Sequence, residues 1–171
     1  MTIGALEYPN VYYVDPRHPA ATDEPGWGYP GVPLASLARA CALAEPGETI
    51  VLRGGVYREA VRPRSDRVTV RAMNGERVTI SGADLIEGWK READGSWAAP
   101  LPAKPNEILR DGKPWHEFTF DPADKRIVVR SGDPRLHGFE TVVREQGIDL
   151  GGKKDVKVEG IMVTNILKAA K

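Results

Sequence analysis

Carboxylates are the residues in this sequence best able to do chemistry. Two of them at a set separation can act as general acid and as nucleophile or base. Asp84 and Glu87 are three residues apart, but no helix is expected there to bring them onto one face. Other acids that could line a groove follow no tight motif; they are Glu59, Glu76, Asp149 and Asp155. Isolated acids in turns are usually solvated, so the catalytic residues stay unknown.

Metal and cofactor sites have no support in the sequence. His18, His116 and His137 are far apart, and no pair of histidines or cysteines has the spacing of metal ligands. Arg53-Gly54-Gly55 precedes an expected strand rather than a helix, so it does not fit a phosphate-binding loop. Cys41 is the only cysteine and is expected to be a small buried side chain. We therefore expect no metal and no cofactor.

Tryptophans carry more information. Trp89, Trp97 and Trp115 all fall between Gly88 and His137. Exposed tryptophan often marks a saccharide site, because the apolar faces of sugar rings stack on aromatic planes. The alternative is that the three rings form a small core of their own. The candidate substrate-binding residues are Trp97, Trp115 and His116, and the Trp115–His116 pair is expected to be exposed.

The elements that would position these residues are short. One helix is expected between Pro33 and Glu45, with Ser36 as its cap or Pro33 as its first residue. Its apolar residues recur with helical spacing at Leu34, Leu37, Ala38 and Cys41. Short strands with no helix between them follow at Thr49–Leu52, Val56–Val61, Val68–Arg71 and Arg77–Ile80. Strands this short suit a solenoid, in which successive coils bury each other's inward residues.

A different pattern begins near Gly88. Turn signals at Asp94-Gly95 and Asp111-Gly112, and a loop over residues 121–125, indicate antiparallel hairpins. The alternation within Arg126–Arg130 is imperfect, so the sequence does not show which face of that strand is buried. Short alternating strands return at 145–150 and 156–163.

Composition limits the possible partners. The 171 residues include 24 basic and 24 acidic side chains, so the formal net charge is zero. Such a chain has no electrostatic reason to bind nucleic acid or an anionic membrane. No apolar stretch is long enough to span a bilayer, and Met1–Tyr13 lacks the pattern of a signal peptide. We expect no nucleic acid and no membrane as partner, and localisation stays unknown from these residues.

Several stretches together carry a family resemblance. Those near the start are Tyr12–Pro16, Pro33–Leu37 and Ala44–Glu59. The later ones are Gly88–Trp89, Gly95–Trp97, Arg110–Lys113, Val128–Arg130, Gly147–Leu150 and Val156–Gly160. The first group resembles the N-terminal signature of the right-handed parallel β-helix superfamily, which is pectate-lyase-like. The second is similar to the insertion and following coil of β-helix glycoside-hydrolase-like proteins, whose N-terminal layout polysaccharide lyases share.

This resemblance implies an all-β fold: a right-handed parallel β-helix, or solenoid, with an N-terminal capping α-helix and an antiparallel β insertion. Residues 1–87 would form the cap and first coils, residues 88–137 the hairpin insertion, and residues 138–171 a further, truncated coil. It also implies the N-terminal portion of a polysaccharide-degrading protein, either a glycoside hydrolase or a polysaccharide lyase. Its catalytic groups would lie on later coils, so this chain alone would be catalytically incomplete.

The expected partner is a polysaccharide or oligosaccharide, and the resemblance favours an extracellular or cell-envelope location. The open C-terminal coil, ending at Lys168–Lys171, would allow self-association. The alternative is a non-catalytic solenoid: a scaffold, an adhesin or a carbohydrate-binding module, possibly engineered or truncated. Neither the sugar nor its linkage can be read from the residues.

Overall fold

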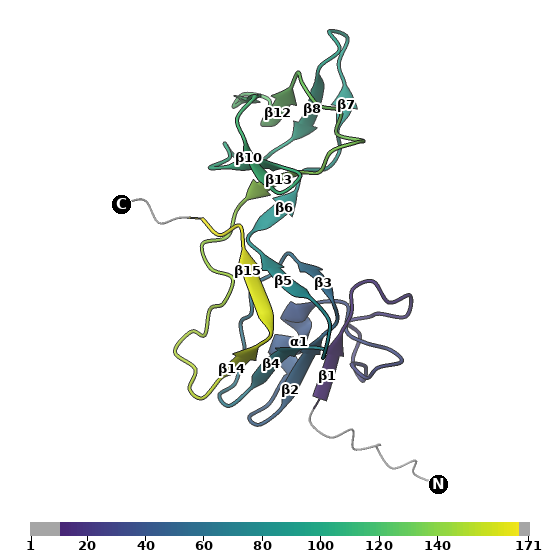
Figure 1. Cartoon of the computed structure of the whole chain (residues 1–171), viewed down its shortest axis with the longest axis vertical. Helices are drawn as coiled ribbons and strands as arrows, with labels where there is room; N and C mark the ends of the chain where they lie inside the picture. The colour runs from purple at the N-terminus through teal and green to yellow at the C-terminus, as the bar shows by residue number, and fades with distance from the viewer. Residues whose placement is uncertain (1–10, 168–171) are drawn as a thin grey trace. The chain divides into compact units, whose positions relative to one another are not determined.

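A computed structural model describes residues 11–167 of the chain (Figure 1). These residues divide into two compact units. Unit 1 contains residues 11–81 and 146–164, and unit 2 contains residues 82–145 and 165–167.

Unit 1 holds two parallel sheets. In the first, β1 (Val11–Val14), β2 (Thr49–Leu52), β4 (Thr69–Ala72) and β14 (Lys157–Glu159) lie side by side in that order (Figure 1). The second has the order β15 (Ile161–Thr164), β5 (Val78–Ser81), β3 (Gly55–Tyr57). Val14 is in register with Leu52, and Leu52 with Ala72, so β1, β2 and β4 end at the same level. The residues that follow these strands are therefore brought together.

The helix α1 (Leu37–Leu43) confirms the helix expected from the apolar spacing. Ser36 is its N-cap, and the Ser36 hydroxyl accepts a hydrogen bond from Arg39 N at 3.1 Å. The Glu59 carboxylate accepts from Leu37 N at 3.1 Å and from Ala38 N at 2.7 Å. These bonds satisfy backbone donors that the first turn of a helix leaves unpaired. The buried residues of α1 are Leu37, Ala40 and Cys41, which pack into the core of unit 1. The expected face is therefore wrong at Ala38, which is exposed, and Leu34 is buried but precedes the helix.

Unit 2 holds two antiparallel sheets. One has the order β10 (Lys113–Trp115), β9 (Ile108–Arg110), β13 (Phe139–Val142), β6 (Ala83–Leu85). The other has the order β11 (Phe118–Asp121), β12 (Arg126–Val129), β8 (Trp97–Pro100), β7 (Lys90–Arg91). The expected hairpins are present: Asp111-Gly112 joins β9 to β10, and residues 122–125 join β11 to β12. The apolar core of this unit contains Ile108, Ile127, Val129 and Phe139.

The expectation of a right-handed parallel β-helix is wrong. Neighbouring coils of a solenoid run parallel, whereas β6 and β13, which lie in the segments expected to form coils, pair antiparallel with each other. The described strands form four small sheets, two parallel and two antiparallel, with one helix. Without a solenoid there is no open coil end for the helix to cap, so the expected capping role is wrong as well. The helix α1 instead contacts β1 and β2 and packs its apolar face into the core. The chain is largely β.

Two expectations fall on residues outside those described. They are the absence of a signal-peptide pattern in Met1–Tyr13, of which residues 1–10 are not described, and the open end at Lys168–Lys171. The roles assigned to residues 1–87, 88–137 and 138–171 stay predictions. Within residues 11–167 no helix is long and apolar enough to cross a membrane.

Candidate functional site

Trp97 and Trp115 pack on the core of unit 2, and His116 is exposed. Trp97 is in register with Val129 on the inward face of its sheet. Trp115 meets the buried ring of Phe139 edge-on, with 5.1 Å between the ring centroids. Both tryptophans are half-buried, which supports the view that they form part of a local core. The structure therefore gives these rings a packing role, and their contact with sugar stays a prediction.

Trp97 is also covered by a cation. The Arg135 guanidinium lies 5.0 Å from the centre of the Trp97 ring. Asp133 holds that guanidinium through both of its carboxylate oxygens, at 3.0 Å from Nε and 2.5 Å from Nη2. A sugar could stack on this face of Trp97 only by displacing Arg135. Trp97 is therefore not a ready stacking platform.

A groove of about 550 Å³ lies on the outward face of the sheet formed by β7, β8, β12 and β11. Side chains alternate across a strand, so Ile127 and Val129 face the core while Val128 faces outward between Thr119 and Ala98. The hydrogen-bonding side chains that line the groove are Glu92, Asp94, Ser96, Thr119, Arg126 and Arg130, together with Asp121. Donors and acceptors therefore lie side by side on this surface.

Arg126 organises the acids at one side of the groove. Its Nη1 lies 3.3 Å from Glu92 Oε1, and its Nε lies 3.7 Å from Asp121 Oδ2 and 3.4 Å from Asp124 Oδ2. One guanidinium therefore faces three carboxylates, which leaves this side of the groove with excess negative charge. Arg130 supplies a further cation to the lining.

Two acids of the groove are held in their charged form. Hydrogen bonds from the Ser96 hydroxyl at 2.6 Å and from Ser96 N at 3.0 Å lower the pKa of Asp94. Hydrogen bonds from Asp124 N and Ala123 N lower the pKa of Asp121. Donors stabilise a carboxylate over its protonated form. Both groups therefore act near neutral pH as acceptors, not as proton donors.

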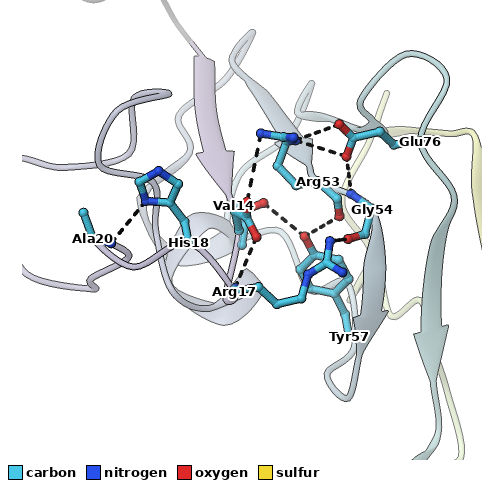
Figure 2. A network of polar contacts seen from close by, with 9 residues as sticks. Val14, Arg17, His18, Ala20, Arg53, Gly54, Tyr57 and Glu76 are labelled. Carbon is cyan, nitrogen blue, oxygen red and sulfur yellow. Dashed lines mark hydrogen bonds and ion pairs between the residues drawn. The ribbon is translucent and has the colours of Figure 1, made fainter.

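Unit 1 contains a polar network between strand ends, which Figure 2 shows. The Glu76 carboxylate accepts from Arg53 Nε at 2.8 and 3.0 Å, and from Gly54 N at 2.5 Å. The Gly54 bond is the largest cause of a lowered pKa of Glu76, followed by Arg53. Arg17 Nη2 donates to the carbonyl oxygen of Gly54. These bonds fix the turn between β2 and β3.

Tyr57 anchors the same network from below the surface. Its side chain is 2% exposed, and its hydroxyl lies 2.7 Å from Arg53 O and 3.0 Å from Val14 O (Figure 2). Burial, reinforced by the negative charge of Asp15, raises the pKa of Tyr57. The phenol therefore stays protonated and donates its hydrogen to these carbonyl groups. It ties the end of β1 to the end of β2.

Beside this network lies a pocket of about 90 Å³. Its lining includes Asp15 and Arg53, which directly follow β1 and β2, and Met73, which directly follows β4. Side chains that follow parallel strands meet at one edge of the sheet, where open parallel sheets commonly bind ligands. Tyr13, Pro30 and Pro33 complete the lining.

The acids considered from the sequence take structural roles or lie at the surface. Glu59 binds the first turn of α1, Asp84 pairs with Arg144 at 2.7 Å, and Asp149 pairs with Arg62 at 3.3 Å. Glu87 and Asp155 are exposed.

The histidines lie in separate settings. His18 Nδ1 accepts from Ala20 N (Figure 2), and His137 Nδ1 lies 2.7 Å from Asp111 Oδ2. Within residues 11–167 no group of three or more His, Cys, Asp or Glu side chains is arranged to hold a metal ion.

Sequence reasoning missed most of the residues that line the two cavities. Glu76 was considered as a groove acid and lies beside the pocket of unit 1. Asp15 and Arg53 directly follow short apolar runs, a position that would have indicated them once the strands were known to be parallel. Asp121 is the first residue of the expected hairpin loop and Arg126 directly follows that loop, but only the register shows that their side of the sheet faces outward.

Comparisons with known proteins give a likeness of fold. No family model matches the chain, and no curated protein matches it. The structure of XylC, solved in complex with xylose, is similar with a TM-score of 0.70 and 19% sequence identity. The match covers 91% of this chain and 35% of XylC, so the chain spans about a third of that protein. A second structure, described as a glycoside hydrolase, has a TM-score of 0.47 at 21% identity, covering 64% of this chain and 22% of that one. The chain thus shares the fold of part of XylC, and the resemblance to pectate-lyase-like proteins stays untested.

Proposed function

We propose that this chain is a carbohydrate-binding portion of a glycoside-hydrolase-like protein, and that the outward groove of unit 2 takes a neutral oligosaccharide. The observation that carries the proposal is the groove itself. Its volume of about 550 Å³ lies in the range of small-molecule sites. It combines guanidinium donors, carboxylate acceptors and hydroxyl groups, which together match the alternating donors and acceptors of a sugar. The fold shared with part of XylC, whose structure was solved in complex with xylose, supports the choice of ligand.

The chemistry of the groove favours binding over cleavage. Hydrolysis of a glycosidic bond needs one carboxylic acid with a raised pKa to protonate the leaving oxygen. Asp94 and Asp121 have lowered pKa values, so each is ionised near neutral pH. In the whole protein, the residues that cleave the sugar would then lie outside this groove.

A titration of the isotope-labelled chain with xylotriose, followed by amide NMR, tests the proposal. We expect shifts at Ser96, Thr119 and Val128. The substitution Arg130→Gln should weaken binding about three- to tenfold, since it removes a charged hydrogen-bond donor worth ~1 kcal/mol in an exposed setting. Lys104→Gln, an exposed charge change away from the groove in the same unit, is the control.

Two results would contradict the proposal: no shift of the groove amides at millimolar xylotriose, or equal binding by the parent and Arg130→Gln. Shifts centred on Trp115 and His116 would instead move the site to the pair predicted from the sequence. In that case His116→Ala should weaken binding. It is the better test of that pair, since Trp115 packs on Phe139 and its truncation would damage the core.

A further inference from the structure

We infer that the pocket at the ends of β1, β2 and β4 is a second binding site, which takes a neutral pair of neighbouring hydroxyl groups such as one edge of a sugar ring. The pocket lies in unit 1 and shares no residue with the groove of unit 2. The inference therefore stands independently of the function proposed for the groove.

One carboxylate oxygen of Asp15 has no hydrogen-bond partner among the described residues. Asp15 is 9% exposed. Its Oδ1 accepts a hydrogen bond from Arg17 N at 3.2 Å. Its Oδ2 has only Arg53 Nη1 at 4.0 Å, which is beyond hydrogen-bond distance. The Asp15 side chain is 12% exposed and lines the pocket, so a donor bound there can reach this oxygen.

A hydrogen-bond donor, the Arg53 guanidinium, is held next to that acceptor. Both oxygens of Glu76 bind Arg53 Nε, which fixes the plane of the guanidinium (Figure 2). Its Nη1 is thereby presented toward Asp15. A hydroxyl group can donate to Asp15 Oδ2 and accept from Arg53 Nη1 at the same time, because one hydroxyl is both donor and acceptor. Two neighbouring hydroxyl groups, one bound to Asp15 Oδ2 and one to Arg53 Nη1, form both hydrogen bonds with straighter angles.

The charged groups around the pocket balance one another. Asp15 and Glu76 contribute two negative charges, and Arg17 and Arg53 contribute two positive charges, so the sum is zero. A cationic ligand on Asp15 would meet the repulsion of Arg53 at 4.0 Å. An anionic ligand on Arg53 would be repelled by the carboxylates of Asp15 and Glu76. A neutral polyol carries neither penalty.

The apolar residues that line the pocket match the C–H groups of such a ligand. Tyr13, Pro30, Pro33 and Met73 surround the two charged groups with apolar surface. Aromatic and proline rings pack against the C–H faces of sugars. A volume of about 90 Å³ is well below that of a site enclosing a whole drug-sized molecule, so the pocket takes one edge of a ring.

The test is an amide NMR titration of the full chain with xylose, reading Asp15, Arg17 and Gly54 separately from Ser96 and Val128 of the groove. Asp15→Asn keeps the shape and the Oδ1 acceptor but replaces Oδ2 with a donor that faces Arg53. We expect it to weaken binding at the unit 1 amides about ten- to a hundredfold, as befits a buried charged hydrogen bond. The groove amides should respond as in the parent. Glu24→Gln, the same chemical change at an exposed acid of the neighbouring loop, should have no effect.

If Asp15→Asn fails to fold, titrating the parent protein with different ligands tests the inference without any substitution. A fully O-methylated xyloside keeps the ring and its C–H faces but has no hydroxyl donors, so it should leave the unit 1 amides unchanged. Inorganic phosphate and methylammonium should bind more weakly than xylose. The inference is overturned if the methylated ligand or either ion shifts these amides as strongly as xylose does. It is equally overturned if xylose leaves them unmoved or if a folded Asp15→Asn binds as the parent does. The groove amides report on the other proposal in the same spectra.

Discussion

Tyr57→Phe should destabilise unit 1 while leaving its packing intact. The ring of Tyr57 is buried, so phenylalanine keeps the same apolar contacts and removes only the hydroxyl. That hydroxyl donates toward Arg53 O at 2.7 Å and Val14 O at 3.0 Å. Val14 O retains a second hydrogen bond, from Arg53 N at 3.0 Å, so the loss falls mainly on Arg53 O.

The magnitude follows from the energy of one buried neutral hydrogen bond. Such a bond contributes about 0.5–1.5 kcal/mol, and a buried acceptor left unpaired adds a desolvation cost of ~1 kcal/mol. We expect the free energy of unfolding to fall by about 1–2 kcal/mol. For a chain of this length, that corresponds to a loss of about 3–6 °C in melting temperature.

Urea unfolding followed by far-UV circular dichroism measures the loss. Three of the four tryptophans lie in unit 2, so their fluorescence would report chiefly on the wrong unit. Tyr12→Phe is the matched control, because the described residues offer no hydrogen bond to the Tyr12 hydroxyl. If Tyr57→Phe changed the free energy by less than about 0.5 kcal/mol, or no more than Tyr12→Phe, the anchoring role of this hydroxyl would be refuted.

Two further predictions concern charge and close packing. The folded-state pKa of Glu76 is lowered from its ordinary value of 4.5, so its stabilising effect is complete above that pH and disappears as pH falls through the lowered value. Glu76→Gln should therefore be less stable than the parent at pH 7, and the difference should shrink below about pH 4, as chemical unfolding across pH would show. A Cβ atom at Gly82 would overlap the carbonyl oxygen of Asn165, so Gly82→Ala should cost about 3 kcal/mol or more in a thermal melt. Gly31→Ala, where the nearest atom lies at 3.7 Å, should cost little, and equal melting of the two variants would contradict the packing.

Features specified by neighbouring residues were predictable from the sequence. The helix and its Ser36 cap were expected and are present, although Ala40 rather than Ala38 belongs to the buried face. The Asp111-Gly112 turn predicts the hairpin that joins β9 and β10. Such signals need only a few adjacent residues, so no knowledge of the fold is required to read them.

The arrangement of the sheets was not predictable in the same way. The β13 strand pairs with both β6 and β9, and the pairing of Thr141 with Asp84 joins residues far apart in the chain. Nothing in a short strand states whether its distant partner runs parallel or antiparallel. Short strands between turns fit both a solenoid and several small sheets, and the resemblance to the β-helix superfamily favoured the wrong one.

Register, rather than residue type, explains why the cavities were missed. Tryptophan drew attention as a sugar-binding type, yet Trp97 lies in register with Val129 on the inward face. On the same strands Arg126 and Val128 face outward, although the sequence around them alternates imperfectly. Asp15 and Arg53 meet only because Val14 and Leu52 are paired. Composition identifies candidate chemistry, but pairing decides which side chains share a surface.

Substitutions of ligand-contacting residues should affect stability less in the groove than in the pocket of unit 1. The groove uses outward positions of a sheet whose inward positions, such as Ile127 and Val129, supply the core, so its polar side chains can change with little loss of stability. The pocket of unit 1 uses Asp15 and Arg53, which belong to the network that Tyr57 and Glu76 hold in place. Weakening that network should release the guanidinium from its fixed plane and so weaken ligand binding as well. Tyr57→Phe should therefore reduce xylose affinity at the pocket without changing the groove, because only the pocket depends on the anchored strand ends.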